Sequence, residues 1–307
     1  MRVNEWLFRD GALARDGWDC VVDASTPGWQ HTGLRVGRLE GERMLRLEAG
    51  SVERLVVPLA GSFVVTWNDA DVAGETVLEG RRGVLDGPTD VLFLGAGSAM
   101  TVRGAGRVAV AEALTSDRRP VQYVPAADVP VELRGAGRAS RQVQNVGTPG
   151  VVDAARLIVC EVLTPAGNWS SFPAHKHDED LPGVESQLEE IYWFSTDPQG
   201  YGVFTSHSSE AGEIETAARV HDGDVALVPY GYHGPAAAPP GTDLYYLNVM
   251  AGPGERVWLV SDDPAEAAIR ESWSQQAVDP RLPFGTPERP GGVAGTSSTA
   301  AGEKERR

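Results

Sequence analysis

The stretch that decides the fold ends in a histidine: Gly223-Asp-Val-Ala-Leu-Val-Pro-Tyr-Gly-Tyr-His233. Two shorter stretches precede it, His175-Lys176-His177 and Glu189-Glu190. Alternate side chains of a strand share a face, so the two histidines of the first stretch can aim at one point while Lys176 turns away. Two histidines, an acid and a third histidine after a glycine turn have the spacing of a divalent-metal site. The pattern predicts a metal inside a β structure.

The composition of the 307-residue chain favours a globular, mostly β protein. Hydrophobic residues make up 41% of the chain, which is enough for a sizeable core. Many short Val/Leu runs are separated by 36 glycines and 21 prolines, as in proteins with numerous short strands. The expected strands are 54–59, 62–67, 90–94, 107–111, 157–162, 191–194, 225–228 and 244–250, followed by a short helix over 263–273.

The net charge of −16 argues against nucleic acid and anionic lipid as partners. An acidic substrate would require a few arginines or lysines gathered inside its pocket. The chain has neither a signal-like start nor 18 consecutive apolar residues, so we expect a cytoplasmic protein that makes no membrane contact. Cys20 and Cys160 are then expected to be reduced thiols.

The two halves of the chain resemble each other. Gly87–Gly97 is loosely echoed by Gly223–Gly231, each a β run that ends in a turn, and we interpret this as an old duplication. The expected units are an N-terminal barrel over 1–125, a metal-binding barrel over 126–275 and a flexible tail over 276–307. The first unit has only His31, so it lacks a ligand set and is expected to serve packing and contacts in a homo-oligomer.

The histidine stretches resemble the two motifs of the cupins, and further runs resemble one bicupin family. These runs are Ser171-Phe-Pro-Ala-His-Lys-His-Asp-Glu-Asp180, Leu188-Glu-Glu-Ile-Tyr192, Asp222–His233 and Asp243–Pro253, with weaker echoes in Thr26–Trp29 and Asp86–Asp90. The family is that of the 5-deoxyglucuronate isomerases of myo-inositol catabolism, which are related to the 4-deoxy-5-keto-uronate isomerases. The resemblance is dense over about residues 165–265.

The resemblance implies an all-β bicupin of two jelly-roll (double-stranded β-helix) barrels with a few short helices. It also implies an aldose–ketose isomerase that converts 5-deoxy-D-glucuronate, a small-molecule sugar acid, to 2-deoxy-5-keto-D-gluconate. The resemblance further implies that the metal ligands of this chain are His175, His177, Glu190 and His233, with Glu189 as the alternative acid. Strand alternation favours Glu190, which shares a face with Tyr192. Mixed imidazole and carboxylate ligation suits Zn, Mn, Fe, Ni or Co, and we expect Zn.

Polar residues near the motifs are candidates for the chemistry. Tyr192 and Tyr246 are the candidate catalytic groups, and Tyr232 and Asn248 the candidate substrate contacts, although packing of aromatic rings in the core is an equal alternative for the tyrosines. Lys176 is expected to be a surface or oligomer contact, and residues 178–180 are expected to form a solvated acidic loop.

One departure from the family concerns substrate binding. Its members commonly carry a Gln-Arg pair on the strand after a Pro-Gln-Gly turn, whereas residues 198–207 contain no arginine. If that arginine holds the substrate carboxylate, His207 or Arg219 are the candidate substitutes. Two other functions fit the same ligand set: an Fe(II) cupin dioxygenase and a non-enzymatic bicupin that binds a sugar acid.

Overall fold

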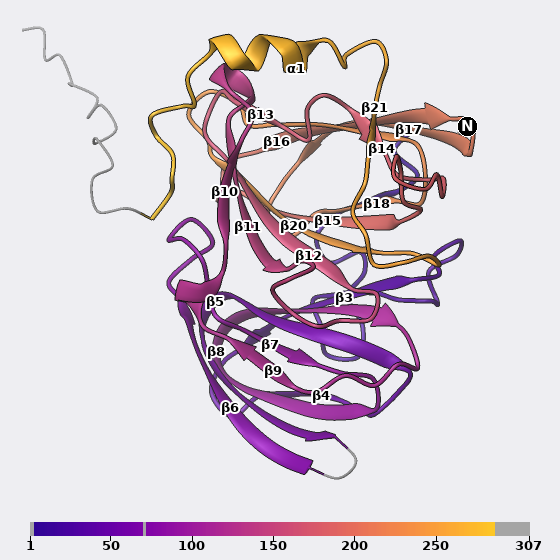
Figure 1. Ribbon diagram of the computed structural model, residues 1–307. Helices are drawn as coiled ribbons and strands as arrows, with labels where there is room; N and C mark the ends of the chain where they lie inside the picture. Colours follow the sequence, from indigo (N-terminus) through magenta and orange to yellow (C-terminus); the bar gives the residue numbers. More distant parts are fainter. Residues whose placement is uncertain (1–2, 70–71, 286–307) are drawn as a thin grey trace, which may run out of the picture.

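The computed structural model describes residues 3–69 and 72–285, and its strands pair antiparallel throughout this part of the chain. Two β-barrels lie one above the other, with the N-terminal half in violet and magenta below the C-terminal half in red and orange (Figure 1). Short helical turns complete the structure at η1 (Ala126–Asp128), η2 (Gly137–Ala139), α1 (Ile269–Ser272) and η3 (Trp273–Gln275). The all-β bicupin expected from the sequence is confirmed.

Two sheets form the C-terminal barrel. The first has the order β1 (Leu7–Phe8), β18 (Val225–Val228), β15 (Glu189–Ser195), β20 (Leu244–Ala251), β12 (Ile158–Thr164), β11 (Arg141–Gly147) and β10 (Val131–Arg134). The second has the order β17 (Gly212–Val220), β16 (Gly202–Ser209), β19 (Tyr232–Ala237), β14 (His175–Lys176) and β21 (Ser261–Asp262), with β13 (Trp169–Ser170) beside β19. The histidine stretches thus lie on the second sheet and the glutamates on the first.

The N-terminal barrel is one sheet that folds over on itself. Its order is β2 (Cys20–Val22), β3 (Thr32–Leu39), β8 (Ser98–Leu114), β5 (Val52–Asp69), β7 (Val91–Leu94) and β9 (Gln122–Val124), with β4 (Met44–Leu47) on β8 and β6 (Val72–Arg81) on β5. The first part of β5 pairs with β7 and its last part with β6, and the register shifts between Pro58 and Ala60. Proline cannot donate to the ladder, and such a bulge bends a strand, so β5 passes from one layer to the other.

The strand register fixes which side chains face the interior of the C-terminal barrel. Phe194, Tyr246, Val162 and Val143 are direct partners along neighbouring strands, and direct partners point to the same face. All four belong to one buried cluster inside this barrel. A second buried cluster fills the N-terminal barrel, and a third joins the two halves. Strands of the two facing sheets, such as β8 and β15, therefore have one face inside their own barrel and the other face against the opposite barrel.

An N-terminal arm crosses to the C-terminal barrel. Leu7 and Phe8 form β1 against β18, and the backbone of Asn4 donates to the carbonyl of Glu215 in β17. Arg9 pairs with the buried Asp224 at 2.6 Å between Nη1 and Oδ2. Figure 1 shows the N-terminus beside β17. Although residues 1–125 were assigned to the first barrel, the arm contributes a strand to the second.

Several expectations about single segments need correction. Residues 276–285 do not form a flexible tail, because Leu282 and Phe284 are buried in the core between the barrels; residues 286–307 lie outside the described residues. The helix expected over 263–273 is limited to turns followed by α1 and η3. Residues 54–59 and 62–67 form one continuous strand, β5.

Two further observations concern the cysteines and the helices of the described residues. Cys20 and Cys160 are both buried and free of a disulfide. Within residues 3–69 and 72–285, no helix has the length and apolar character needed to cross a membrane.

Candidate metal centre

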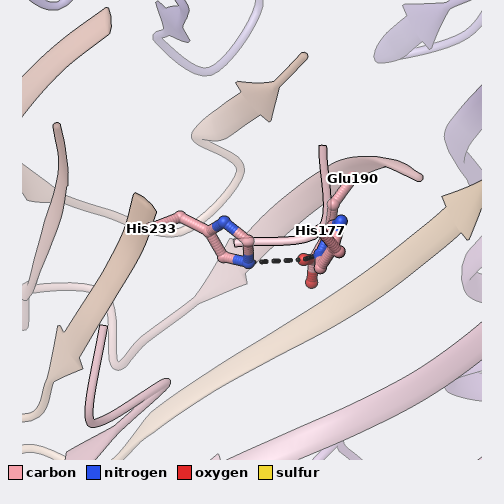
Figure 2. Close-up of side chains that lie close together, drawn as sticks. All are labelled: His177, Glu190 and His233. Atoms are coloured by element: carbon pink, nitrogen blue, oxygen red, sulfur yellow. Dashed lines mark hydrogen bonds and ion pairs between the residues drawn. The ribbon is translucent and has the colours of Figure 1, made fainter. Parts of the chain in front are cut away.

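Three of the four expected ligands meet inside the C-terminal barrel. Glu190 on β15 lies between His177, which follows β14, and His233 on β19 (Figure 2). The Oε2 atom of Glu190 is 2.9 Å from Nε2 of His177 and 3.0 Å from Nε2 of His233. All three residues are at most 2% exposed. Their ligand atoms all lie within 4.8 Å of one another, as a single cation requires.

His175 stands at the edge of this group. Its ring centroid is 4.6 Å from that of His233 and 6.5 Å from that of His177. It pairs directly with His233 across β14 and β19 and lines the cavity in front of Glu190. The structure therefore brings His177, Glu190 and His233 into one cluster and places His175 beside it.

The hydrogen bonds of the three imidazoles suit a metal. In each ring Nδ1 faces a backbone carbonyl: Pro173 at 3.0 Å for His175, Leu188 at 2.9 Å for His177 and Gly231 at 3.2 Å for His233. A carbonyl oxygen only accepts, so Nδ1 carries the hydrogen and, in a neutral ring, Nε2 offers a lone pair. Metal-binding histidines are commonly oriented in this way.

The contact between Glu190 and the two rings also calls for a cation. The Nε2 atom of His233 is buried and makes no directed hydrogen bond, although Oε2 of Glu190 is 3.0 Å away. A lone pair of a neutral ring facing a carboxylate oxygen at this distance is repulsive unless a proton or a metal lies between them. The residues present therefore fit a divalent metal with imidazole and carboxylate ligands.

The electrostatics favour an ionised Glu190 and a neutral His175, as metal binding needs, whereas they favour a proton on His177 that a metal would displace. Burial would raise the pKa of Glu190, but the hydrogen bond with His177 and the nearby imidazoles of His177 and His233 lower it to about 2. Burial and the charge of His233 lower the pKa of His175 well below its usual value. Burial opposes protonation of His177, yet Glu190 outweighs it and raises the pKa of that ring. The site is an ionised carboxylate among imidazoles.

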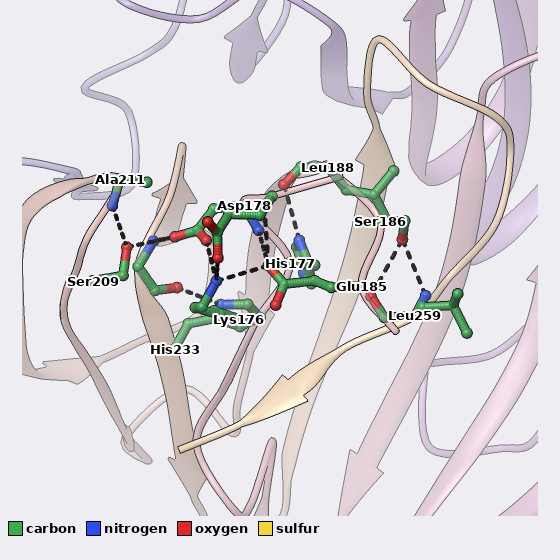
Figure 3. Close-up of polar contacts among 12 residues, drawn as sticks. Lys176, His177, Asp178, Glu185, Ser186, Leu188, Ser209, Ala211, His233 and Leu259 are labelled. Carbon is green, nitrogen blue, oxygen red and sulfur yellow. Dashed lines mark hydrogen bonds and ion pairs between the residues drawn. The ribbon is translucent and has the colours of Figure 1, made fainter. Parts of the chain in front are cut away.

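Lys176 holds the loop between His177 and Glu190. Its ammonium lies 2.8 Å from Asp178 and 2.9 Å from Glu185 (Figure 3). It also lies 2.6 Å from Glu179. Lys176 turns away from the metal cluster as expected, but it is only 9% exposed and is not a surface contact. The carboxylates of Asp178, Glu179 and Glu185 could hold a cation, and the lysine ammonium binds among them.

The acidic loop is tied to the ligand strands. Asp178, expected to be solvated, is buried and accepts hydrogen bonds from Ser209 at 2.5 Å and from the backbone of Gly231 at 2.8 Å. Gly231 lies two residues before His233, and Asp178 follows His177 directly. Because this contact joins the segments that carry two ligands, it fixes their separation.

The two glutamates of β15 point to opposite faces, as strand alternation predicts. Glu190 lines the cavity, whereas Glu189 turns toward the N-terminal barrel. Glu189 accepts hydrogen bonds from the backbone of Gln30 at 3.1 Å and from His31 and Thr32 at 2.5 Å each. The carboxylate of Glu189 thus binds the backbone of the N-terminal barrel and points away from the metal cluster, so Glu190 is the candidate metal ligand.

A cavity of about 330 Å³ opens in front of Glu190, a size suited to a small ligand. It is lined by Arg134, Arg141, Val143, Val162, Ser171, His175, Glu190, Tyr192, Tyr246, Asn248, Trp258, Val260 and Arg270. A larger cavity of about 620 Å³ lies between the barrels, but no histidine lines it. The chemistry therefore favours the smaller cavity as the functional site.

The candidate catalytic tyrosines share a hydroxyl partner that the motifs did not reveal. Ser171 Oγ is 3.1 Å from the hydroxyl of Tyr192 and 3.1 Å from that of Tyr246. Ser171 has φ +43°, a strained value for a residue with a side chain, and such strain tends to occur at functional sites. Burial raises the pKa of Tyr246 to about 12 and that of Tyr192 well above its usual value. Both hydroxyls are therefore protonated at neutral pH.

Of the two candidate substrate contacts, Asn248 lines the cavity and Tyr232 does not. Asn248 is 3% exposed, lines the cavity and has no partner for its Nδ2 among the described residues. Tyr232 does not line the cavity; it precedes His233 on β19 and stacks on His207, with ring centroids 5.1 Å apart. Neighbouring residues of a strand face opposite sides, so Tyr232 lies outside the barrel.

Neither candidate substitute for the family arginine reaches the cavity. His207 is exposed and its Nε2 lies 2.9 Å from Asp263. Arg219 is exposed and its guanidinium lies over Tyr201. The arginines that do line the cavity are Arg134 and Arg141, from β10 and β11, and Arg270, from α1. Strand alternation within 131–147 was the signal that could have found them.

Comparison with known proteins identifies the family of the chain and agrees with the fold. A model of the KduI/IolB family matches residues 6–269. The chain belongs to this family. The 5-deoxy-glucuronate isomerase of Geobacillus kaustophilus (strain HTA426) is 36% identical over 260 residues, which cover 82% of this chain and 90% of the relative. That of Shouchella clausii (strain KSM-K16) is 40% identical over 243 residues, covering 77% and 87%. The resemblance found in the motifs is confirmed.

Solved structures place the KduI/IolB chain among the bicupins. The crystal structure of an IolB-like protein from Salmonella typhimurium LT2 has a TM-score of 0.78 at 31% identity and covers 86% of this chain and 99% of that one. The Lactobacillus farciminis oxalate decarboxylase in its formate complex has a TM-score of 0.62 at 11% identity, covering 85% and 89%. The second likeness shows the fold alone.

Proposed function

We propose that this protein is a metal-dependent aldose–ketose isomerase that converts 5-deoxy-D-glucuronate to 2-deoxy-5-keto-D-gluconate in inositol catabolism. The names of its relatives at 36% and 40% identity support the reaction. The single observation that carries it is the cluster of His177, Glu190 and His233, whose glutamate lines a partly enclosed cavity together with His175. His175 completes the ligand set of the proposal.

The reaction moves a hydrogen between the carbonyl carbon and the neighbouring hydroxyl-bearing carbon. A divalent metal at this site would act as a Lewis acid on the two substrate oxygens. The protein holds its ligands rigidly, because each imidazole is anchored through Nδ1 and Glu190 is fixed between two of them. Among the candidate ions we propose zinc.

The tyrosine–serine chain is proposed to handle protons. Since Tyr192 and Tyr246 keep their protons at neutral pH, they serve as donors to substrate oxygens and not as bases. Ser171 links both hydroxyls, so a proton given up by one tyrosine can be replaced from the other. Asn248 adds a free amide donor at the cavity wall. These four side chains orient the substrate by hydrogen bonds, and a tyrosine that gives a proton to one substrate oxygen recovers one from the other substrate oxygen as the isomerisation completes.

The test combines metal analysis with a turnover assay. Purified protein is analysed for bound metals, treated with a chelator, and incubated with 5-deoxy-D-glucuronate before and after metal is restored. We expect ketose formation, followed by NMR, to disappear on chelation and return with metal. Full activity without metal would overturn the proposal. An oxygen electrode in the same assay separates isomerisation from a dioxygenase reaction, which would consume oxygen.

A further inference from the structure

Three arginines converge on the cavity of a chain whose net charge is −16. Arg134 comes from the end of β10, Arg141 from the start of β11 and Arg270 from α1. Guanidinium groups gathered at one concave, partly enclosed place create a positive potential there. Three arginines at one cavity are unexpected in a chain with so many acidic residues. The polar partners of each arginine show whether its charge is already neutralised within the protein.

Two of the three arginines have a carboxylate of their own. Arg134 donates to Glu132 at 2.8 Å and lies over the ring of Trp258. Arg270 pairs with Asp262 through both of its nitrogens Nε and Nη2. Both side chains are more than one third exposed, Arg134 at 35% and Arg270 at 41%. Their charges are balanced locally and partly screened by solvent.

Arg141 has no such partner among the described residues. Only 8% of it is exposed, and its one hydrogen bond is from Nη1 to the backbone carbonyl of Ala139, at 3.1 Å. Its guanidinium lies over the ring of Trp273, 5.6 Å from the centroid. A guanidinium has five N–H donors, and a buried cation is costly unless it is paired. The remaining donors of Arg141 have no protein acceptor among the described residues and are available at the cavity that Arg141 lines.

The register makes this lack more costly. Arg134 and Arg141 are direct partners across β10 and β11, so two like charges face each other on one side of the sheet. Burial, together with the charges of Arg134 and Arg270, lowers the pKa of Arg141 to about 10. An anion bound among these groups would remove both penalties at once.

The same register aims Arg141 toward the candidate metal centre. Arg141 lies two residues before Val143 and so shares its face, and Val143 is aligned through Val162 with Tyr246. Tyr246 lines the cavity together with Glu190. Arg141 thus belongs to the inner wall that carries the proposed chemistry, at the β10–β11 end of the sheet.

We infer that Arg141 binds the carboxylate of a sugar-acid substrate whose other end reaches the metal ligands, an assignment that rests on the proposed function. Arginine suits the task because its planar fork can donate two parallel hydrogen bonds to a carboxylate. Trp273 supports the guanidinium from one face, and Arg134 and Arg270 add positive charge around it. Arg141 thus selects acids over neutral sugars.

The test compares an acidic ligand with its neutral counterpart. Metal-loaded wild-type protein, Arg141→Gln and Arg141→Lys are titrated by calorimetry with 5-deoxy-D-glucuronate and with 5-deoxy-D-glucose, in which a primary alcohol takes the place of the carboxylate. Turnover and metal content are measured on the same samples. Arg138→Gln is the matched control, since Arg138 lies three residues away, is exposed and does not line the cavity.

We expect wild-type protein to prefer the acid on the order of 10- to 100-fold, as charge-assisted hydrogen bonds give. Arg141→Gln should lose this preference while keeping its metal and its affinity for the neutral sugar. Arg141→Lys should regain part of it, and Arg138→Gln should behave as wild type. A merely structural role would weaken both ligands equally, so the preference distinguishes the two even if the variant is less stable.

The outcomes separate this inference from the proposed function. If wild-type protein turns the acid over but the preference survives in Arg141→Gln, the inference is wrong and the function stands. If wild-type protein prefers the acid through Arg141 without turning it over, the function is wrong and the inference stands. If wild-type protein shows no preference for the acid, the inference is wrong whatever the turnover.

Discussion

Strand β15 of the C-terminal barrel and strand β5 of the N-terminal barrel both carry, near their start, a glutamate that contacts the other barrel. The residue after this glutamate differs between the two strands. In β15, Glu189 crosses to the backbone of residues 30–32 in the N-terminal barrel. In β5, Glu53 crosses in the opposite direction and accepts hydrogen bonds from the backbone of residues 155–157, each at 2.7 Å. Such reciprocity is what the duplication expected from the sequence would leave. The following residues, Glu190 and Arg54, both turn inward.

The inward residues show what distinguishes a site from a core. Arg54 pairs with the buried Glu112 at 2.9 Å and donates to two backbone carbonyls. Its charge is therefore neutralised, and each of its three nitrogens has a hydrogen-bond partner. The rest of that interior is an apolar cluster that includes Phe63 and Leu92. Around Glu190 stand imidazoles, tyrosine hydroxyls and a cavity. The same scaffold thus gives a packed core or a reactive site, according to whether its inward polar groups satisfy one another.

The strongest test of this contrast is His177→Ala. Removing one imidazole should abolish metal binding and reduce isomerisation by about 1,000-fold or more, equivalent to about 4 kcal/mol. Elemental analysis and the NMR assay measure both effects, and circular dichroism follows the fold. His31→Ala, which removes the only histidine of the N-terminal barrel, is the control and should keep its metal. Metal retained by His177→Ala would contradict the assignment.

Arg54→Ala probes the opposite barrel. It leaves Glu112 buried with only Arg35 as a partner, which should cost about 3 kcal/mol of unfolding free energy. Denaturant unfolding measures the loss. Metal content and turnover per folded molecule should be unchanged. A loss of metal in this variant would show that the N-terminal interior takes part in the site.

Lys176→Met tests how the ligand loop is held. Its three carboxylates would lose their common cation and the loop would loosen, so metal affinity should fall about 10- to 100-fold. Competition with a fluorescent chelator measures the affinity. Arg82→Met removes a cation from an exposed pair and should leave metal affinity as it is. Equal effects in the two variants would mean that net charge, and not the loop, matters.

The smallest effects are expected from the crossing carboxylates. Glu53→Gln and Glu189→Gln each weaken three backbone hydrogen bonds, and each should cost about 1–2 kcal/mol of stability. Only Glu189→Gln should also lower turnover, because Glu189 is adjacent to Glu190. Thermal melts and kinetics on the pair measure the difference. Equal turnover in both variants would show that Glu190 is held without help from its neighbour.

The sequence predicted the all-β class from its short strand-like runs, whereas the clustering of His177, Glu190 and His233 was expected from their spacing and from the family resemblance. Residues 225–228 form the expected strand, and Glu190 faces inward with Tyr192 as alternation requires. His175 was expected in the same cluster but stands beside it. Spacing fixes the face of a side chain, whereas the distance between strands from separate sheets depends on tertiary packing.

What the sequence did not predict depends on contacts between distant segments. Lys176 was expected at the surface because it turns away from the metal, yet residues 178–185 fold back over it. Arg141 lies far before His175 in the sequence, and the pairing of β11 with β12 and of β12 with β20 brings it to the cavity. Leu282 and Phe284 lie in the Pro-rich segment that begins near Pro280 and is typical of tails, yet both side chains are buried in the core between the barrels.

The N-terminal arm has a consequence for attempts to divide the protein. Because β1 covers the free edge of β18, and Asn4 is bonded to β17, a fragment that starts after residue 125 would expose unpaired backbone groups on both sheets of the reactive barrel. Uncovered strand edges recruit other chains and favour aggregation. Severing the polypeptide at its apparent midpoint would thus yield an insoluble half, whereas co-expressing the two pieces could restore the missing strand by complementation.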